Sequence, residues 1–220
     1  MFQWYYAKID EKDLLQKLNF FLPYVSKERR YKVQMLCVGL EKKISLYSEL
    51  LVRTVLCTAL QIKNNDLVFG KQALGKPFLK TNPALHFNLS HSSNTIAVSV
   101  SDDPVGIDIE KLKAADFRIA QRFFTPREWS YISKSNQSSD NRFFEIWTKK
   151  EAYVKYTGKG LSIPLHSFDV MEDFFAKQIQ TWTKDDSIIS ICGRNAQHCF
   201  VDGIEMKEQA IEDQILTYSR

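Results

Sequence analysis

The sequence predicts an α/β fold of the α+β kind, in which helices and short antiparallel strands mix in each half of the chain. Three observations support this class. Apolar residues recur at helical spacing through residues 41–61. Apolar and polar residues alternate through 86–90, 96–100 and 105–110, and tight turns separate these segments. After residue 125, helical patterns again precede short alternating segments, so both halves combine helices with a small sheet.

The first forty residues predict one strand and two helices. Residues 2–9 form an aromatic, strand-like segment, and the helical spacing that follows stops at Pro23. Ser26 is a typical N-cap for the second helix, which we expect to end at Gly39.

Basic residues follow the start of that second helix. Lys27 and Arg30 lie three residues apart, hence on one face, and the third helix carries the polar Ser45 in its apolar stripe. A solvated basic face is the ordinary explanation for the two cations, and an anion site is the alternative.

A turn-rich stretch after the third helix contains Gly75, Lys76 and Pro77. Gly and Pro on either side of a Lys make a fixed loop with exposed backbone groups and one cation. Such a loop can hold an anion or a base ring, although an ordinary surface turn explains the same residues.

The three alternating segments predict an up-down-up meander if neighbouring strands pair. In the third strand, Asp108 and Glu110 point to one face, about 6.6–6.8 Å apart along the strand, so both carboxylates can reach one cation. The meander brings Ser90 and His91 to the same edge of the sheet. Gly106 has no side chain and leaves room beside the carboxylates for a ligand. A strand with a polar outer face is the competing explanation.

A capping box formed by Thr125 and Glu128 predicts a helix start. The next helix carries Lys150, Glu151 and Lys155, and Gly158 ends it. Because Glu151 and Lys155 lie four residues apart, they share a face. This spacing is equally typical of an exposed, ion-paired helix.

The C-terminal third predicts short strands near 167–171, 179–182, 188–192 and 199–201, and a helix within 205–217.

Composition limits the classes of function. The 220 residues, with 44% hydrophobic and 25% charged residues, suit one large or two small globular domains. The net charge of +4 permits an anionic ligand or acidic partner but is too weak to argue for nucleic acid. Four scattered cysteines without a C-x-x-C pair make a zinc site or a dense disulfide framework unexpected. No apolar run reaches the ~18 residues of a membrane span and no signal peptide is visible, so we expect a cytoplasmic protein.

Several of these stretches occur together, in order, between about residues 26 and 170, and together they resemble the Sfp-type family of the 4′-phosphopantetheinyl transferase superfamily. The stretches that carry the resemblance are Gly75-Lys76-Pro77, Phe87-Asn88-Leu89-Ser90-His91-Ser92, Val105-Gly106-Ile107-Asp108-Ile109-Glu110, Arg122-Phe123-Phe124 and Trp147-x-x-Lys150-Glu151-Ala152-x-x-Lys155-x-x-Gly158-x-Gly160.

The resemblance implies two similar α/β halves related by a pseudo-twofold axis, here 1–104 and 105–220, in a monomer that binds coenzyme A in the cleft between them. It implies a Mg²⁺ site on Asp108, Glu110 and Glu151. The residues implied to bind coenzyme A are Lys27, Arg30, Ser45 and His91 at the 3′-phosphate, Gly75, Lys76 and Pro77 at the adenine, and Lys150 and Lys155 at the diphosphate, with Ser90 beside His91. Family members often carry Arg where this chain has Ile44, so we expect a 3′-phosphate site that is weaker or differently built here.

The implied reaction transfers the 4′-phosphopantetheine group from coenzyme A to a serine of an acyl or peptidyl carrier protein domain and releases 3′,5′-ADP. Glu151 is the candidate base, acting directly or through a metal-bound water, and Lys155 is the candidate stabiliser of the leaving group. Carrier domains are small acidic bundles, so we expect docking on the basic and aromatic stretch 111–124, with Phe117 and Arg118 exposed.

Two other functions stay open at this point. One is a non-catalytic protein that binds coenzyme A or a nucleotide on the same scaffold. The other is a Mg²⁺-dependent phosphoester hydrolase, to which bare carboxylates would also lead.

Overall fold

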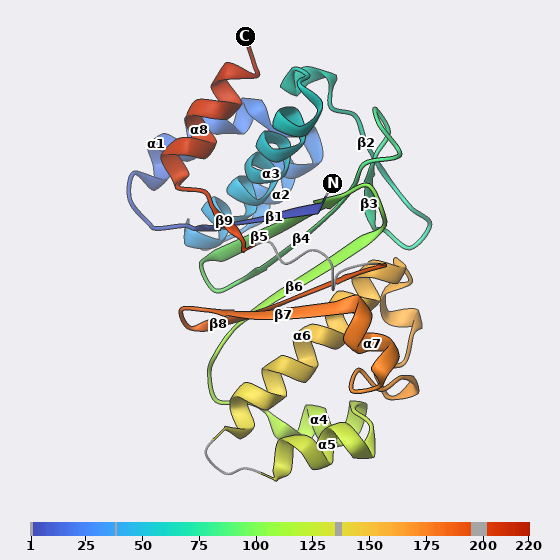
Figure 1. Cartoon of the computed structure of the whole chain (residues 1–220). Helices are drawn as coiled ribbons and strands as arrows, with labels where there is room; N and C mark the ends of the chain where they lie inside the picture. The colour runs from blue at the N-terminus through green and yellow to red at the C-terminus, as the bar shows by residue number, and fades with distance from the viewer. Residues whose placement is uncertain (1, 38, 135–137, 195–201) are drawn as a thin grey trace.

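The computed structural model, which describes residues 2–37, 39–134, 138–194 and 202–220, contains two small sheets covered by helices and a separate two-stranded hairpin (Figure 1). The mixed helix and sheet content confirms the predicted class. A pseudo-twofold relation between the halves remains a prediction.

The first sheet has the strand order β4-β5-β1-β9. β1 (Phe2–Lys8) pairs antiparallel with β5 (Thr95–Ser101), which pairs antiparallel with β4 (His86–Ser92). The short β9 (Ile204–Glu205) pairs parallel with β1. The helices of this half gather on one side of the sheet (Figure 1): α1 (Leu14–Phe21), α2 (Lys27–Met35), α3 (Gly39–Leu60) and α8 (Glu208–Thr217).

α3 is the central helix of this half. It packs against α1, α2, α8 and the sheet, and its residues from Lys43 to Cys57 are buried. The main core cluster forms there, and Leu46, Tyr47, Leu50 and Leu51 have no exposed surface. Lys43 is held there by ion pairs with Asp10 and Glu208, so a buried charge is compensated.

The second sheet has the order β6-β8-β7, all antiparallel. Its strands are β6 (Val105–Lys111), β7 (Ile179–Lys184) and β8 (Ser187–Gly193). α6 (Ser139–Thr157) packs along this sheet, with α4 (Phe117–Phe123) and α5 (Pro126–Ser133) at one end of α6 and α7 (Asp173–Gln178) beside it (Figure 1). A separate hairpin of β2 (Phe69–Lys71) and β3 (Pro77–Leu79) lies against the first half.

Local sequence signals set most helix ends. The Ser26 hydroxyl accepts the Arg29 N–H at 3.1 Å and caps α2. The Thr125–Glu128 capping box is present at the start of α5. Gly158 ends α6 with φ 70°, in the left-handed region that favours glycine. Gly39 differs from the prediction, because α2 already ends at Met35 and Gly39 is the first residue of α3.

The two sheets meet where β4 lies beside β6 (Figure 1). Side chains bridge these strands: the Asn88 Oδ1 accepts the Ile107 N–H at 2.9 Å, and the Ser92 hydroxyl accepts the Lys111 N–H at 3.1 Å. We call this β4–β6 contact the seam. The meander prediction was right for the antiparallel pair β4–β5 and wrong for the third strand, because β5 pairs with β1 on its other edge and β6 pairs with β8.

The C-terminal third confirms the strands near 179–182 and 188–192 and the terminal helix. The strand near 167–171 was wrong, because this stretch holds a single 3₁₀ turn, Leu165–Ser167, followed by turns and irregular backbone. The strand near 199–201 lies outside the described residues. β9 and α8 join the first half, so the structure departs from a division at residue 104 in its last segment.

Candidate active site

A buried carboxylate, an ammonium and a hydroxyl converge at the seam. The Lys155 ammonium lies 2.6 Å from Asp108 Oδ1 and 2.8 Å from the Ser90 hydroxyl. That hydroxyl also donates to Asp108 Oδ1 at 2.8 Å. Asp108 comes from β6, Lys155 from α6 and Ser90 from β4, so both halves of the chain build this group.

Only one of the two carboxylate oxygens of Asp108 is hydrogen-bonded within the described residues. Asp108 is only 4% exposed, and within the described residues its second oxygen, Oδ2, is buried and receives no hydrogen bond. Burial raises the pKa of Asp108 above its ordinary value, against the lowering effect of Lys155. A buried carboxylate oxygen without a partner is costly unless a ligand completes it.

Two further carboxylates lie near Asp108. Glu110 follows on the same face of β6 and accepts a hydrogen bond from the Ser92 hydroxyl at 2.7 Å. Burial, then the charge of Asp108 and more weakly that of Glu110, raise the pKa of Glu151, while Lys155 opposes them. Like charges gathered in this way favour protonation or the arrival of a cation.

Gly106 sets the distance between β6 and α6. A Cβ added at Gly106 would come within 2.1 Å of the Ala152 carbonyl oxygen and 2.3 Å of the Tyr156 nitrogen. The expectation that Gly106 leaves room for a ligand was therefore wrong. The space is filled by the backbone of α6, and this close contact is what brings Lys155 to Asp108.

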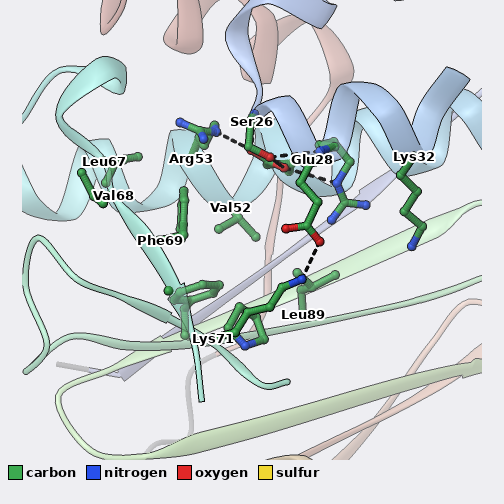
Figure 2. A pocket seen from close by; sticks show the side chains of 15 residues that line it. Ser26, Glu28, Lys32, Val52, Arg53, Leu67, Val68, Phe69, Lys71 and Leu89 are labelled. Carbon is green, nitrogen blue, oxygen red and sulfur yellow. Dashed lines mark hydrogen bonds and ion pairs between the residues drawn. The ribbon is translucent and has the colours of Figure 1, made fainter. Parts of the chain in front are cut away.

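A cavity of about 670 Å³ opens beside the seam in the first half (Figure 2). Its walls come from α2, α3, β4 and the β2–β3 hairpin. The side chains that face it include four cations, two carboxylates and an apolar group: Arg29, Lys32, Arg53, Lys71, Glu28, Glu49, Val52, Leu67, Val68, Phe69, Pro77, Phe87 and Leu89. Because cations outnumber carboxylates, the cavity favours an anionic ligand. Its apolar and aromatic side chains favour a ligand that also has an apolar or aromatic part.

Glu49 holds two of the cations on one wall of this cavity in place. Its carboxylate accepts from Arg53 at 2.7 Å, from Arg29 at 3.3 Å and from the backbone and hydroxyl of Ser26. Arg29 also donates to the Ser45 hydroxyl at 3.1 Å. Burial would raise the pKa of Glu49, but Arg53 and Ser26 outweigh it and hold that pKa below its ordinary value.

His91 lies on β4 between Ser90 and Ser92, whose hydroxyls bond to Asp108 and Glu110. Partial desolvation lowers the pKa of His91, and so do the nearby charges of Lys32, Lys155 and Arg29, against a weaker effect of Glu110. Cations of α2 (Arg29 and Lys32) and of α6 (Lys155) thus influence the charge of this imidazole. An anion bound among these groups would be stabilised by all of them.

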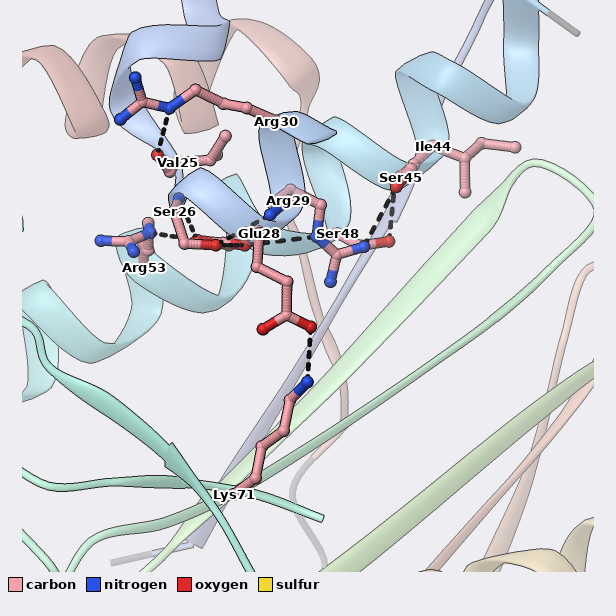
Figure 3. A network of polar contacts seen from close by, with 11 residues as sticks. Val25, Ser26, Glu28, Arg29, Arg30, Ile44, Ser45, Ser48, Arg53 and Lys71 are labelled. Atoms are coloured by element: carbon pink, nitrogen blue, oxygen red, sulfur yellow. Dashed lines mark hydrogen bonds and ion pairs between the residues drawn. The ribbon is translucent and has the colours of Figure 1, made fainter. Parts of the chain in front are cut away.

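Lys27 and Arg30 do not reach this cavity. Lys27 is exposed, and the Arg30 guanidinium donates to the Val25 carbonyl at 3.2 Å (Figure 3). Arg29 and Lys32, also three residues apart, lie on the face of α2 that lines the cavity. A basic face is thus present on α2, but Arg29 and Lys32 form it instead of Lys27 and Arg30.

The Gly75-Lys76-Pro77 loop has a defined conformation. Gly75 has φ 88°, and two backbone hydrogen bonds between Gln72 and the loop close the turn. Of these three residues, Pro77 lines the cavity. The Lys76 ammonium turns toward the second half, where it donates to backbone carbonyls.

Lys150 does not face a diphosphate in this structure. Its ammonium has no exposed surface and pairs with the equally buried Glu128 at 2.8 Å. It also donates to the Leu165 and Phe168 carbonyls, each at 2.7 Å. Because an ammonium has three protons, these three acceptors leave none for a phosphate. Lys150 instead fixes the 165–168 segment against α6.

The two residues expected to dock the carrier, Phe117 and Arg118, differ in exposure. Phe117 is half-buried and packs against Trp129 and Phe143, so the prediction that it is exposed was wrong. Arg118 is 88% exposed and pairs with Asp116 at 2.6 Å. Phe123 is the exposed aromatic residue at the end of α4.

The donor set at the seam fits a divalent cation that prefers oxygen ligands. Asp108 offers a free buried oxygen, and the pKa values of Asp108 and Glu151 are raised first by burial and then by the neighbouring carboxylates, both of which a bound cation would offset. No group of three or more His, Cys, Asp or Glu side chains within the described residues is already arranged to coordinate a metal.

Two family patterns together match most of the chain. Residues 104–210 match the 4′-phosphopantetheinyl transferase superfamily, and residues 12–102 match a second pattern described as 4′-phosphopantetheinyl transferase, N-terminal. The chain is 35% identical over 200 residues to a 4′-phosphopantetheinyl transferase of Bacillus subtilis, which covers 83% of this chain and 87% of the relative. The chain belongs to the 4′-phosphopantetheinyl transferase superfamily.

Other members of the superfamily match at a similar level. The 4′-phosphopantetheinyl transferase gsp of Aneurinibacillus migulanus is 37% identical over 169 residues, covering 76% of this chain and 70% of the relative. The 4′-phosphopantetheinyl transferase Sfp of Bacillus subtilis strain 168 is 36% identical over 151 residues, covering 68% of this chain and 67% of the relative.

This transferase family member also contains cavity residues that sequence reasoning missed. Arg29, Lys32, Glu49, Arg53 and Phe69 all line the cavity. Arg53 lies over the Phe69 ring at 5.0 Å, which joins the ionic wall to the aromatic one. One signal was available in the sequence: Glu49 and Arg53, four residues apart inside an apolar helix, predict a buried ion pair.

Proposed function

We propose that this protein transfers the 4′-phosphopantetheine group of coenzyme A to a serine hydroxyl of an acyl or peptidyl carrier protein domain. The observation that carries the proposal is the seam: a buried carboxylate with a free oxygen, two neighbouring carboxylates and Lys155 lie next to a cationic, partly aromatic cavity. The superfamily membership supports the reaction class.

Coenzyme A fits the character of the cavity. Its adenine would pack in the apolar part, near Phe69, Pro77 and Phe87, and its 3′-phosphate would lie near Arg29 and Lys32. Arg29 already bonds to Ser45 and Glu49, yet a guanidinium has five donors, so others stay available for phosphate. Arg29 would thus supply the guanidinium that relatives often carry at position 44, where this chain has Ile44.

The diphosphate would extend from there to the seam. His91 and Lys155 would contact its oxygens, and Asp108, Glu110 and Glu151 would hold Mg²⁺. Bound Mg²⁺ would neutralise the repulsion between the diphosphate and the carboxylates. Lys155 would exchange part of its contact with Asp108 for the diphosphate.

The transfer needs a proton acceptor and a stabilised leaving group. The serine oxygen forms a bond to the β-phosphorus of coenzyme A while the bond to the 3′,5′-ADP oxygen breaks. The proton of the serine hydroxyl goes to Glu151, whose raised pKa suits a base, and Lys155 balances the negative charge on the departing ADP.

The carrier domain would dock on α4. Its exposed face carries Arg118, Arg122 and Phe123, which suit an acidic helical partner with an apolar centre. The proposal includes a monomer that acts in the cytoplasm. No helix in the described part of the chain is long and apolar enough to cross a membrane.

Mass spectrometry of an apo carrier domain tests the proposed function. The carrier is incubated with the protein, coenzyme A and Mg²⁺, and we expect its serine to gain one phosphopantetheine group. Release of free pantetheine phosphate without labelling would indicate a hydrolase. An unchanged carrier and intact coenzyme A, with measurable binding, would indicate a binding protein.

A further inference from the structure

Lys76 reaches from the cavity-lining hairpin to the helix that carries Glu151 and Lys155. Its ammonium donates to the carbonyls of Val105 at 2.9 Å, Lys155 at 2.5 Å and Tyr156 at 3.2 Å. Because an ammonium has three protons, these acceptors use all of its donors. The Lys76 side chain is therefore committed to protein, not to a ligand.

The three carbonyls lie at a junction that controls the site. Two belong to the last turn of α6, where carbonyls lack intrahelical partners and a cation is favourable. The third belongs to Val105, the first residue of β6. Burial lowers the pKa of Lys76 to about 8, against a weaker raising effect of Cys192.

The same junction contains the closest approach of β6 and α6. Gly106 follows Val105 and touches the α6 backbone at Ala152 and Tyr156, with no room for a Cβ. Asp108 lies two residues along β6, and Lys155 lies on the turn of α6 that Lys76 holds. A small shift of this turn changes the distance between Lys155 and Asp108.

The other end of Lys76 belongs to the cavity wall. Phe69, Gly70, Lys71 and Pro77 of the hairpin line the cavity, and the Gln72–Lys76 backbone bond fixes the loop between them. Gln72 also approaches Gly158, the residue that ends α6: a Cβ added there would lie 2.7 Å from Gln72 Oε1. The hairpin thus contacts the end of α6 at two points.

We propose that Lys76 is a positioning residue that clamps the end of α6 to β6 and to the cavity wall, and so keeps Lys155 and Glu151 in register with Asp108. The part of this inference that is tested by transfer to a carrier domain rests on the proposed function.

Lys76→Met tests the clamp, because it keeps the stem and removes the ammonium. The matched control is Lys80→Met, an exposed lysine that follows the same hairpin. We expect Lys76→Met to lower kcat for carrier labelling at least tenfold and to change the Kd for coenzyme A less than threefold. We expect Lys76→Arg, which keeps the cation, to recover most of the rate, and Lys80→Met to leave both constants unchanged.

Hydrogen exchange gives a readout that does not depend on activity. Backbone amides of residues 154–158 should exchange at least tenfold faster in Lys76→Met than in wild type, with the α3 amides unchanged. If the wild-type protein labels no carrier, the proposed function is wrong. Hydrogen exchange then still shows whether Lys76 holds the end of α6 in place.

Two results would overturn the clamp. One is unchanged exchange at residues 154–158. The other is a raised Kd for coenzyme A with normal kcat, because it would assign Lys76 to the ligand. If Lys76→Met fails to fold, Lys76→Arg decides in its place: normal kcat and exchange support the clamp, and normal exchange with a raised Kd contradicts it.

Discussion

The Lys155 ammonium lies 2.6 Å from the Asp108 carboxylate, and the Ser90 hydroxyl bonds to both groups. The three residues come from α6, β6 and β4, so this contact joins the two halves of the chain. Asp108 keeps a second, buried oxygen without a hydrogen bond in the described structure. In the proposed function, Lys155 would contact the diphosphate and the second oxygen of Asp108 would bind the metal ion.

Replacing Lys155 with Met should impair transfer more than binding. Because the ammonium would balance charge that develops on the leaving group, we expect kcat to fall about 100-fold and KM for coenzyme A to change much less. Lys149→Met is the matched control, since Lys149 lies on the same helix and pairs with Glu145. Equal losses in the two variants, measured by carrier labelling, would remove Lys155 from the mechanism.

Arg29 and Arg30 should differ sharply in their effect on coenzyme A. We expect Arg29→Met to raise KM for coenzyme A about tenfold or more, because a charge-assisted bond to phosphate contributes about 1.5–3 kcal/mol. Arg30→Met should change it little, since the Arg30 side chain bonds to the Val25 carbonyl outside the cavity. With dephospho-coenzyme A, which lacks the 3′-phosphate, the penalty of Arg29→Met should disappear. A penalty of the same size on both substrates would show that Arg29 acts elsewhere.

Glu49 should make the free energy of unfolding depend on pH in the acidic range. Its pKa is held below the ordinary value of 4.5, so the unfolded chain binds the proton more readily than the folded one. The stabilisation is present above pH 4.5 and is lost as pH falls through the lowered pKa. Glu49→Gln should cost about 3 kcal/mol of unfolding free energy at pH 7. Urea titrations between pH 3 and 7 should show the gap between wild type and variant closing toward pH 3, and a constant gap would contradict this role.

The exposed face of α4 should affect binding of the carrier domain but not binding of coenzyme A. We expect Arg118→Glu and Phe123→Ala each to raise KM for the carrier severalfold, because one reverses a charge and the other removes an exposed apolar contact. KM for coenzyme A should stay constant. Phe174→Ala, at an exposed aromatic residue on α7, serves as control. A shared rise of both KM values would place the effect in the fold instead of in docking.

Local signals in the sequence were enough to predict most elements and the strand that carries Asp108 and Glu110. Ser26, the Thr125–Glu128 box and Gly158 act through neighbouring residues, so their roles are visible in a short stretch. The direction of the alternating strands likewise brought Ser90 to Asp108.

Features that depend on distant partners were not predictable. Lys27 with Arg30 and Arg29 with Lys32 have the same spacing, and only the packing of α2 on α3 decides which pair faces the cavity. Lys150 is saturated by Glu128 and by carbonyls of the 165–168 segment, which its own helix does not reveal. Gly106 accommodates a helix that begins more than thirty residues later.

The most direct test of the account is a single-turnover labelling of an apo carrier by wild type and by Glu151→Gln, with coenzyme A affinity measured by calorimetry on the same samples. Glu151 should accept the serine proton, so we expect the labelling rate of the variant to fall at least 100-fold while its Kd for coenzyme A stays within about threefold. A variant that labels the carrier at nearly the wild-type rate would contradict the account.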